Sequence, residues 1–151
     1  MTKEKDEGGT RLGPEWSLHP QLAADATLVG DLALSRLLAI NAADYPWLVL
    51  VPRRLGAAEL ADLGSDAFPL MAEIGLVSLA LKDLTGCDTI NVAAIGNAVP
   101  QLHIHIVGRR QSDPLWPKPI FGVVPLPRAA DADFARFVAK VKKKVAAADV
   151  A

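Results

Sequence analysis

The spacing of apolar residues along the chain predicts two antiparallel strand pairs. The runs 35–41, "SRLLAIN", and 47–54, "WLVLVPRR", are short, apolar and separated by the turn-forming stretch "AADYP", which predicts a first hairpin. The runs 89–96, "TINVAAIG", and 101–108, "QLHIHIVG", flank a loop at 97–100 and predict a second hairpin. Four strands connected in this way indicate an antiparallel sheet.

A helical period predicts one long helix between the hairpins. Over residues 66–84, apolar side chains recur at spacings of three and four and so share one face: Leu70, Ile74, Val77, Leu81 and Leu84. Pro69 lies in the first turn, where its missing N–H costs little, and Gly86 can form a left-handed cap. Residues 57–63 predict at most a turn or two of helix, and Ser65 is expected to cap the long helix.

The C-terminal part of the chain combines an irregular segment with a second helix. Residues 112–127 hold five of the eleven prolines, so we expect them to run irregularly over the surface. The run "ADADFARFVAKVKKKVAAA" predicts a helix with an apolar stripe and a solvated basic face. The stripe is Phe134, Val138, Val141 and Val145, and the basic face is Lys140, Lys142, Lys143 and Lys144. Hairpins and helices without regular strand–helix alternation predict the α+β class.

Length and composition indicate a single folded domain. A chain of 151 residues, 51% hydrophobic and 22% charged, can bury one sizeable core. Residues 1–15 are charged and contain several glycines, which predicts a flexible charged arm outside the fold. We expect the domain over 16–117, followed by the proline-rich segment and C-terminal helix over 118–151.

The charge balance and the single cysteine narrow the class of protein further. Sixteen Lys and Arg against seventeen Asp and Glu give a net charge of -1, so nothing indicates a nucleic-acid or membrane-surface partner. Cys87 cannot form an internal disulfide. The charged N-terminus is unlike a secretory signal, and no apolar run is long enough to span a bilayer. We therefore expect a cytoplasmic protein.

Two of the three histidines stand two residues apart in one apolar run. Side chains alternate along a strand, so Gln101, His103 and His105 are expected to share one face. The residues between them, Leu102, Ile104 and Ile106, then share the core face. Solvated or internally bonded histidines would fit the same pattern, and the third histidine, His19, lies far from this run.

The loop before this run strengthens a catalytic interpretation. In "GNAVP", Gly96 lets backbone approach a ligand, and the Asn97 amide can both donate and accept hydrogen bonds. Together with the histidines, these residues could hold a phosphate beside an imidazole. At pH 7 histidine is partly neutral, so one ring can attack an electrophile while its neighbour donates a proton or hydrogen bond.

These residues resemble the signature of the histidine triad (HIT) superfamily of nucleotide hydrolases and transferases, His-φ-His-φ-His-φ-φ. The signature reads here Gln101-Leu102-His103-Ile104-His105-Ile106-Val107, with two of the three histidines matched. "LLAIN" and "LVLVPRR" resemble the first strands of the family, and "GNAVP" resembles its usual Gly-Gln-x-Val-x approach. The resemblance covers roughly residues 35–117. It implies a HIT-like fold with an antiparallel five-stranded sheet and one long helix. Periodicity adds the C-terminal helix described above.

The resemblance also implies a reaction and a set of roles. His103 would be the nucleophile that attacks the α-phosphate of a nucleotide ester, anhydride or phosphoramidate, giving a nucleotidyl-histidine intermediate. His105 would bond a phosphate oxygen. Asn97, with Gly96, would take the place of a phosphate-contacting family Gln, and Asn41 would bind the ribose hydroxyls. No cofactor and no metal are needed for this route, and the expected assembly is a homodimer.

Two positions depart from the family pattern, and a third resembles one branch of the family. Gln101 replaces the first histidine and cannot carry a proton or positive charge. Ala98 stands where some members have Ser or Thr to assist the leaving group. Trp116-Pro117 resembles a Trp-Pro that reaches the site of the partner subunit, although a tryptophan can equally pin a proline-rich loop.

Two other functions remain open from the sequence. The departures at Gln101 and Ala98 are also expected in a nucleotide-binding module that has lost its chemistry. A His-x-His pair on one strand can bind a metal when a carboxylate completes the ligand set, but the acidic residues closest in sequence are Asp88 and Asp113. Arg109 and Arg110 could meet a polyphosphate or could form a solvated strand end.

Overall fold

The computed structural model describes residues 15–149, so the predicted arm over 1–15 lies almost entirely outside the described residues. The strands form one five-stranded sheet in the order β1-β2-β3-β5-β4, with every neighbouring pair antiparallel. The predicted α+β class with an antiparallel five-stranded sheet is thereby confirmed. The strands are β1 (Thr27–Asp31), β2 (Ser35–Ile40), β3 (Trp47–Pro52), β4 (Thr89–Ala93) and β5 (Ile104–Arg109).

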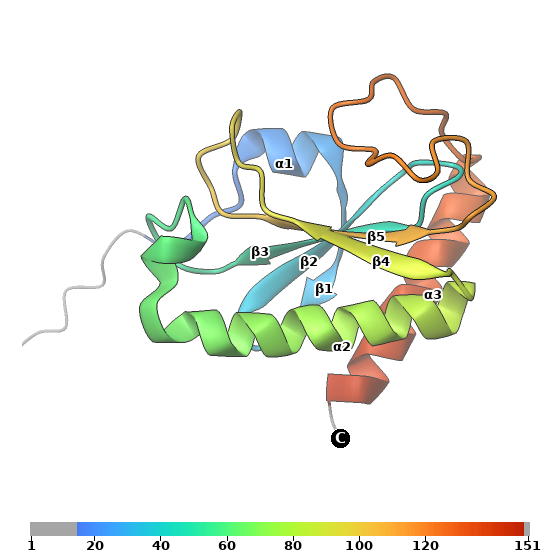
Figure 1. The fold of residues 1–151 in the computed structure, drawn as a ribbon. Helices are drawn as coiled ribbons and strands as arrows, with labels where there is room; N and C mark the ends of the chain where they lie inside the picture. The colour runs from blue at the N-terminus through green and yellow to red at the C-terminus, as the bar shows by residue number, and fades with distance from the viewer. Residues whose placement is uncertain (1–14, 150–151) are drawn as a thin grey trace, which may run out of the picture.

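The helices lie on both faces of this sheet. Two 19-residue helices, α2 (Ala67–Thr85) and α3 (Asp131–Asp149), cover one face, while the short α1 (Pro20–Asp25) and the proline-rich segment lie over the other (Figure 1). A 3-10 helix, η1 (Leu60–Asp66), leads directly into α2. Among the described residues, no helix is both long and apolar enough to cross a membrane.

Strand alternation divides the apolar residues between the two faces. Leu37, Leu48 and Ile106 point to the helix-covered face and belong to the main core, together with Leu70, Val77 and Leu81 of α2 and Val141 and Val145 of α3. On the opposite face, Leu38 and Val49 pack with Leu22 and Val99. The predicted stripes on the two long helices are therefore confirmed as their buried faces.

The ends of α2 show one correct and one wrong expectation. Gly86 follows the helix at φ 61°, the left-handed cap that was expected. Ser65 does not cap the helix, because η1 runs into α2 and the amide of Ala67 donates to the carbonyls of Gly64 and Ser65. Within η1 the backbone kinks at Gly64, which has φ 55° and ψ -126°.

The second hairpin is shorter than its apolar run. β4 and β5 pair as expected, with Val92 opposite Ile106, but β5 begins only at Ile104. Upstream, the amide of Leu102 donates to the carbonyl of Ala57 instead of a sheet partner, at 2.9 Å. Gln101 and His103 therefore precede the strand, and only His105 belongs to it.

A buried ion pair anchors the segment that leaves β5. The guanidinium of Arg109, 1% exposed, makes two hydrogen bonds to the Asp113 carboxylate at 2.8 and 2.9 Å, and a third to Asn91 at 2.9 Å. Arg109 holds the pKa of the Asp113 carboxyl below its usual value. The guanidinium also faces the rings of Tyr45 and Trp116. Arg109 is thus neither a solvated strand end nor free for a polyphosphate.

We predict that Asp113→Asn destabilises the protein by about 3–5 kcal/mol, because it leaves a buried guanidinium without its counter-ion. Asp133→Asn, which breaks an exposed pair with Arg136 on α3, is the matched control and should cost less than about 1 kcal/mol. Urea denaturation of the three proteins measures both values. Equal losses of unfolding free energy in the two variants would show that the buried pair stabilises the protein no more than the exposed pair.

Candidate functional site

His103 is buried at the entrance to β5 and held by the main chain. The residue is 7% exposed, and its Nδ1 lies 2.7 Å from the backbone carbonyl oxygen of Gln101. A carbonyl only accepts hydrogen bonds, so Nδ1 carries the proton in this bond. The neutral ring then has its lone pair on Nε2, which is the state a nucleophilic imidazole requires.

A small cavity opens at this ring. Its volume is about 190 Å³, and it is lined by His103 and Leu102, by Gly96 and Asn97 of the loop after β4, and by Ala58 to Leu60, where η1 begins. Gly96 has φ 55°, a left-handed conformation that disfavours other residues. The structure therefore brings His103, Asn97 and Gly96 together, as the sequence predicts.

His105 lies beside His103 on the outer face of the sheet. The two ring centroids are 5.1 Å apart with an interplanar angle of 84°. The indole Nε1 of Trp47 donates a hydrogen bond to His105 Nδ1 at 3.0 Å, and the ring of Phe121 packs at 5.5 Å. Burial, with a smaller contribution from the charge of His103, lowers the pKa of His105 to about 4. His105 is therefore neutral at physiological pH.

The side chain of Gln101 is directed away from the histidines. Its Oε1 accepts from the amide of His19 at 2.8 Å, and its Nε2 donates to the carbonyl of Ser17 at 2.9 Å. His19 itself caps α1 by accepting from the amide of Gln21. The contact from Gln101 to His103 thus comes from its backbone, while its side chain ties the segment before α1 to the entrance of β5.

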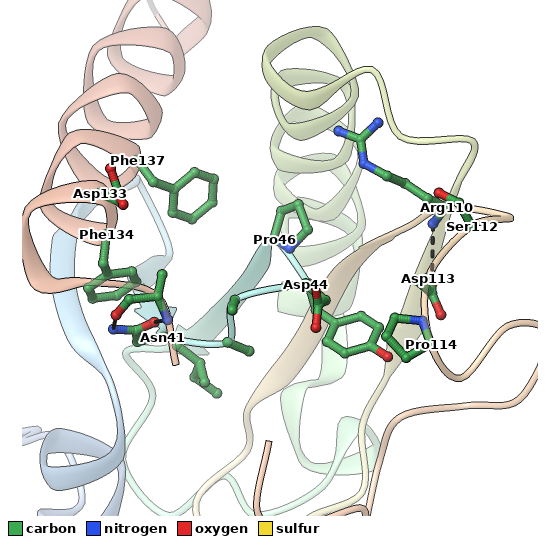
Figure 2. A pocket seen from close by; sticks show the side chains of 15 residues that line it. Asn41, Asp44, Pro46, Arg110, Ser112, Asp113, Pro114, Asp133, Phe134 and Phe137 are labelled. Carbon is green, nitrogen blue, oxygen red and sulfur yellow. Dashed lines mark hydrogen bonds between the residues drawn. The ribbon is translucent and has the colours of Figure 1, made fainter. Parts of the chain in front are cut away.

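Asn41 lies in a different and larger cleft. This cleft, of about 510 Å³, is formed by the loop between β2 and β3, the segment after β5 and the start of α3 (Figure 2). Both polar atoms of the Asn41 amide bond the backbone of Ala129, at 2.9 and 3.2 Å. Asn41 therefore pins the segment before α3, and the structure does not bring it to the cavity of His103.

Trp116 is also separate from that cavity within one chain. The guanidinium of Arg109 lies over its ring, and the residue is 37% exposed. Arg110 donates to the carbonyl of Thr85 at the end of α2 and lines the larger cleft.

Within residues 15–149, no group of three or more His, Cys, Asp or Glu side chains is arranged to hold a metal ion.

The sequence interpretation missed Trp47 and Phe121. Trp47 opens β3 opposite Val107, two positions along from the Val49–His105 pair, so its side chain shares a face with His105. Knowing that β3 pairs with β5 would have revealed this neighbour. Phe121 comes from the proline-rich segment, whose path no periodicity predicts.

The chain resembles known proteins in both sequence and fold. A family model described as HIT domain matches residues 21–112. The structure of a histidine triad protein from Bradyrhizobium japonicum is 47% identical, with a TM-score of 0.83, covering 87% of this chain and 99% of the other. No match was found among curated proteins.

Two further solved structures show the same likeness. A histidine triad protein from Marinobacter aquaeolei is 36% identical, with a TM-score of 0.83, covering 89% of this chain and 98% of the other. A histidine triad (HIT) protein from Sinorhizobium meliloti is 35% identical, with a TM-score of 0.81, covering 85% and 96%. Coverage of nearly the whole of each relative shows that this chain has their complete fold.

We predict that His105 makes the protein less stable in mild acid. The folded pKa of about 4 lies below the ordinary 6.5, so between these values the unfolded chain binds a proton that the folded chain does not. The free energy of unfolding then falls as pH falls through this window, by roughly 2–3 kcal/mol at pH 4.5. His105→Gln should lose this part of the dependence in urea titrations at pH 7 and 4.5. An unchanged pH dependence in the variant would contradict the assignment.

Proposed function

Because the chain belongs to the HIT domain family, we propose that it is an enzyme that cleaves a nucleotide at the α-phosphate through a nucleotidyl-histidine intermediate on His103. Membership of the family supports the general class, a nucleotide-binding hydrolase or transferase. The observation that carries the finer proposal is the His103 ring, buried at a cavity with its Nδ1 tied to a carbonyl and Nε2 left with the lone pair. We propose a nucleoside phosphoramidate or dinucleoside polyphosphate as substrate.

The first step forms a bond between Nε2 of His103 and the α-phosphorus. The bond from phosphorus to the leaving group breaks, and the leaving group departs with the electron pair and takes a proton from solvent. As the ring becomes cationic, the carbonyl of Gln101 stabilises the Nδ1–H of the imidazolium at 2.7 Å. Splitting the displacement in two lowers each barrier.

Water or another acceptor attacks the phosphorus in the second step. The phosphorus–nitrogen bond breaks, its electron pair returns to Nε2, and the nucleotide leaves with the oxygen of the acceptor, whose proton passes to solvent. Asn97 of the same cavity can donate its amide to the phosphoryl oxygens during both steps. A cavity of about 190 Å³ fits the phosphoryl end of a nucleotide better than the whole molecule.

The rate of the proposed reaction should depend on the leaving group. Ala98, beside Asn97, has no hydroxyl to donate a proton, so good leaving groups such as a polyphosphate should react faster than poor ones.

The proposed chemistry uses no metal and is expected to proceed in EDTA. We place it in the cytoplasm, where the single and buried Cys87 stays reduced.

A nucleotide-binding module without turnover is the second candidate. It is favoured by Gln101, which stands in place of a histidine and directs its side chain to Ser17 and His19. A binding module would gain thermal stability from nucleotides but would release no product. The two candidates therefore differ in a simple assay of product formation.

We further propose that the chain forms a homodimer through α2 and the edge strand β4. Phe68, Met71 and Leu79 are 81%, 67% and 66% exposed, and their spacing of three and eight residues places them on one side of α2. On the adjacent edge strand, Val92 is 48% exposed. An apolar patch beside an unpaired strand edge is typical of a protein interface. A two-fold dimer would cover both at once.

We predict that His103→Ala lowers kcat on the order of 10⁴-fold, because it removes the nucleophile. The assay follows nucleoside monophosphate release from an adenosine phosphoramidate and a dinucleoside polyphosphate in EDTA. His19→Ala makes the same chemical change outside the cavity and should keep most of the activity. Retention of activity in the His103 variant would contradict the mechanism, and nucleotide-induced stabilisation without any turnover would favour the binding module.

We predict a mass of about 32 kDa, twice the chain mass of 16.0 kDa, by light scattering at micromolar concentration. Leu79→Asp should shift the protein to the monomer, since it buries a charge in the interface. Lys143→Gln, on the exposed face of α3, also lowers the charge by one unit and should leave the dimer intact. A wild-type mass near that of one chain would contradict the proposed interface.

A further inference from the structure

Trp47 makes a hydrogen bond to His105 that determines the tautomer of that imidazole. Its indole Nε1 lies 3.0 Å from His105 Nδ1, across the junction of the neighbouring strands β3 and β5. The two rings meet edge to face, with centroids 5.5 Å apart and an interplanar angle of 65°. The contact is therefore both a directed hydrogen bond and a packed aromatic pair.

An indole N–H donates hydrogen bonds and cannot accept them. His105 Nδ1 must then present its lone pair to Trp47, and in the neutral ring the proton resides on Nε2. The alternative tautomer would place two N–H groups against each other and leave the partly buried indole without an acceptor, which is unfavourable.

His103 is fixed in the opposite way. Its Nδ1 faces the Gln101 carbonyl at 2.7 Å, and a carbonyl accepts only, so its proton resides on Nδ1. The two adjacent rings, 5.1 Å apart, thus have complementary roles. His103 offers a lone pair at Nε2, and His105 offers a hydrogen-bond donor at Nε2.

Packing restricts rotation of the His105 ring. Phe121 of the proline-rich segment contacts it with centroids 5.5 Å apart, and Trp47 and Phe121 contact each other at 6.1 Å. A flipped ring would present a carbon to the indole N–H and lose the hydrogen bond. The aromatic neighbours and the hydrogen bond therefore favour the same orientation.

We propose that Trp47 is a positioning residue that locks His105 in the Nε2–H tautomer, so that His105 donates to a phosphoryl oxygen while His103 attacks. The assignment of the donor to a phosphoryl oxygen rests on the proposed function. The tautomer itself does not, because it follows from the contacts of the free protein.

The direct test is NMR of the free, ¹⁵N-labelled wild-type protein at neutral pH. We expect the His105 ring nitrogens to show a single Nε2–H tautomer, and a scalar coupling between Trp47 Nε1 and His105 Nδ1 through the hydrogen bond. Absence of the coupling together with an Nδ1–H tautomer would overturn the proposal without any variant.

Trp47→Phe tests the cause, because it keeps an aromatic ring and removes the N–H. Trp16→Phe is the matched control, since within residues 15–149 the Trp16 Nε1 is buried and has no hydrogen-bond partner. We expect His105 in Trp47→Phe to populate both tautomers and Trp16→Phe to retain the single one. A single Nε2–H tautomer in Trp47→Phe would overturn the role of the indole.

Turnover gives the functional arm of the same experiment. We expect kcat of Trp47→Phe to fall by about tenfold or more with little change in KM, as expected when an orienting partner of a catalytic histidine is lost. Mixed tautomers with unchanged kcat would overturn the catalytic consequence. If the wild-type protein has no turnover, the proposed function fails, while the tautomer result still decides the role of Trp47.

Discussion

The central position of β5 constrains most of this structure. The strand pairs with β3 on one side and β4 on the other, so neither of its edges is free. Its side chains must therefore sort strictly by face, with Ile104 and Ile106 in the core under α2 and His105 on the opposite face. The core side fixes the register, because a slip by one residue would bury the imidazole and expose both isoleucines. Packing energy thus determines which face of the sheet carries His105.

Each of the two histidine rings has a hydrogen-bond partner that can act in only one way. These partners fix which ring nitrogen carries the proton. The carbonyl that faces His103 can only accept, and the indole that faces His105 can only donate. Neither ring needs a neighbouring carboxylate to set its proton, and burial keeps His105 neutral. In the proposed reaction, the cavity at His103 then needs only hydrogen-bond donors for the phosphoryl oxygens, and Asn97 lines the same cavity.

Periodic parts of the fold could be predicted from the sequence, while long-range polar contacts could not. The long helix α2 followed from spacing and its glycine cap, and the His-x-His motif with "GNAVP" located the cavity. The strand β1 was missed because its pairing is interrupted by an irregularity between Leu28 and Gly30. Gln101 and Asn41 bond partners 82 and 88 residues away, and no local pattern encodes these partners. Arg109 was misread for a different reason: its partner Asp113 is only four residues away, but its burial depends on how the segment after β5 packs over it.

The most direct test of the account is rapid-quench mass spectrometry of the wild-type protein during turnover of an adenosine phosphoramidate. We predict a transient mass increase of one adenylyl group, which peptide mapping places on His103. Product formation with no adduct, or an adduct on another residue, would contradict the claim that this imidazole is the nucleophile.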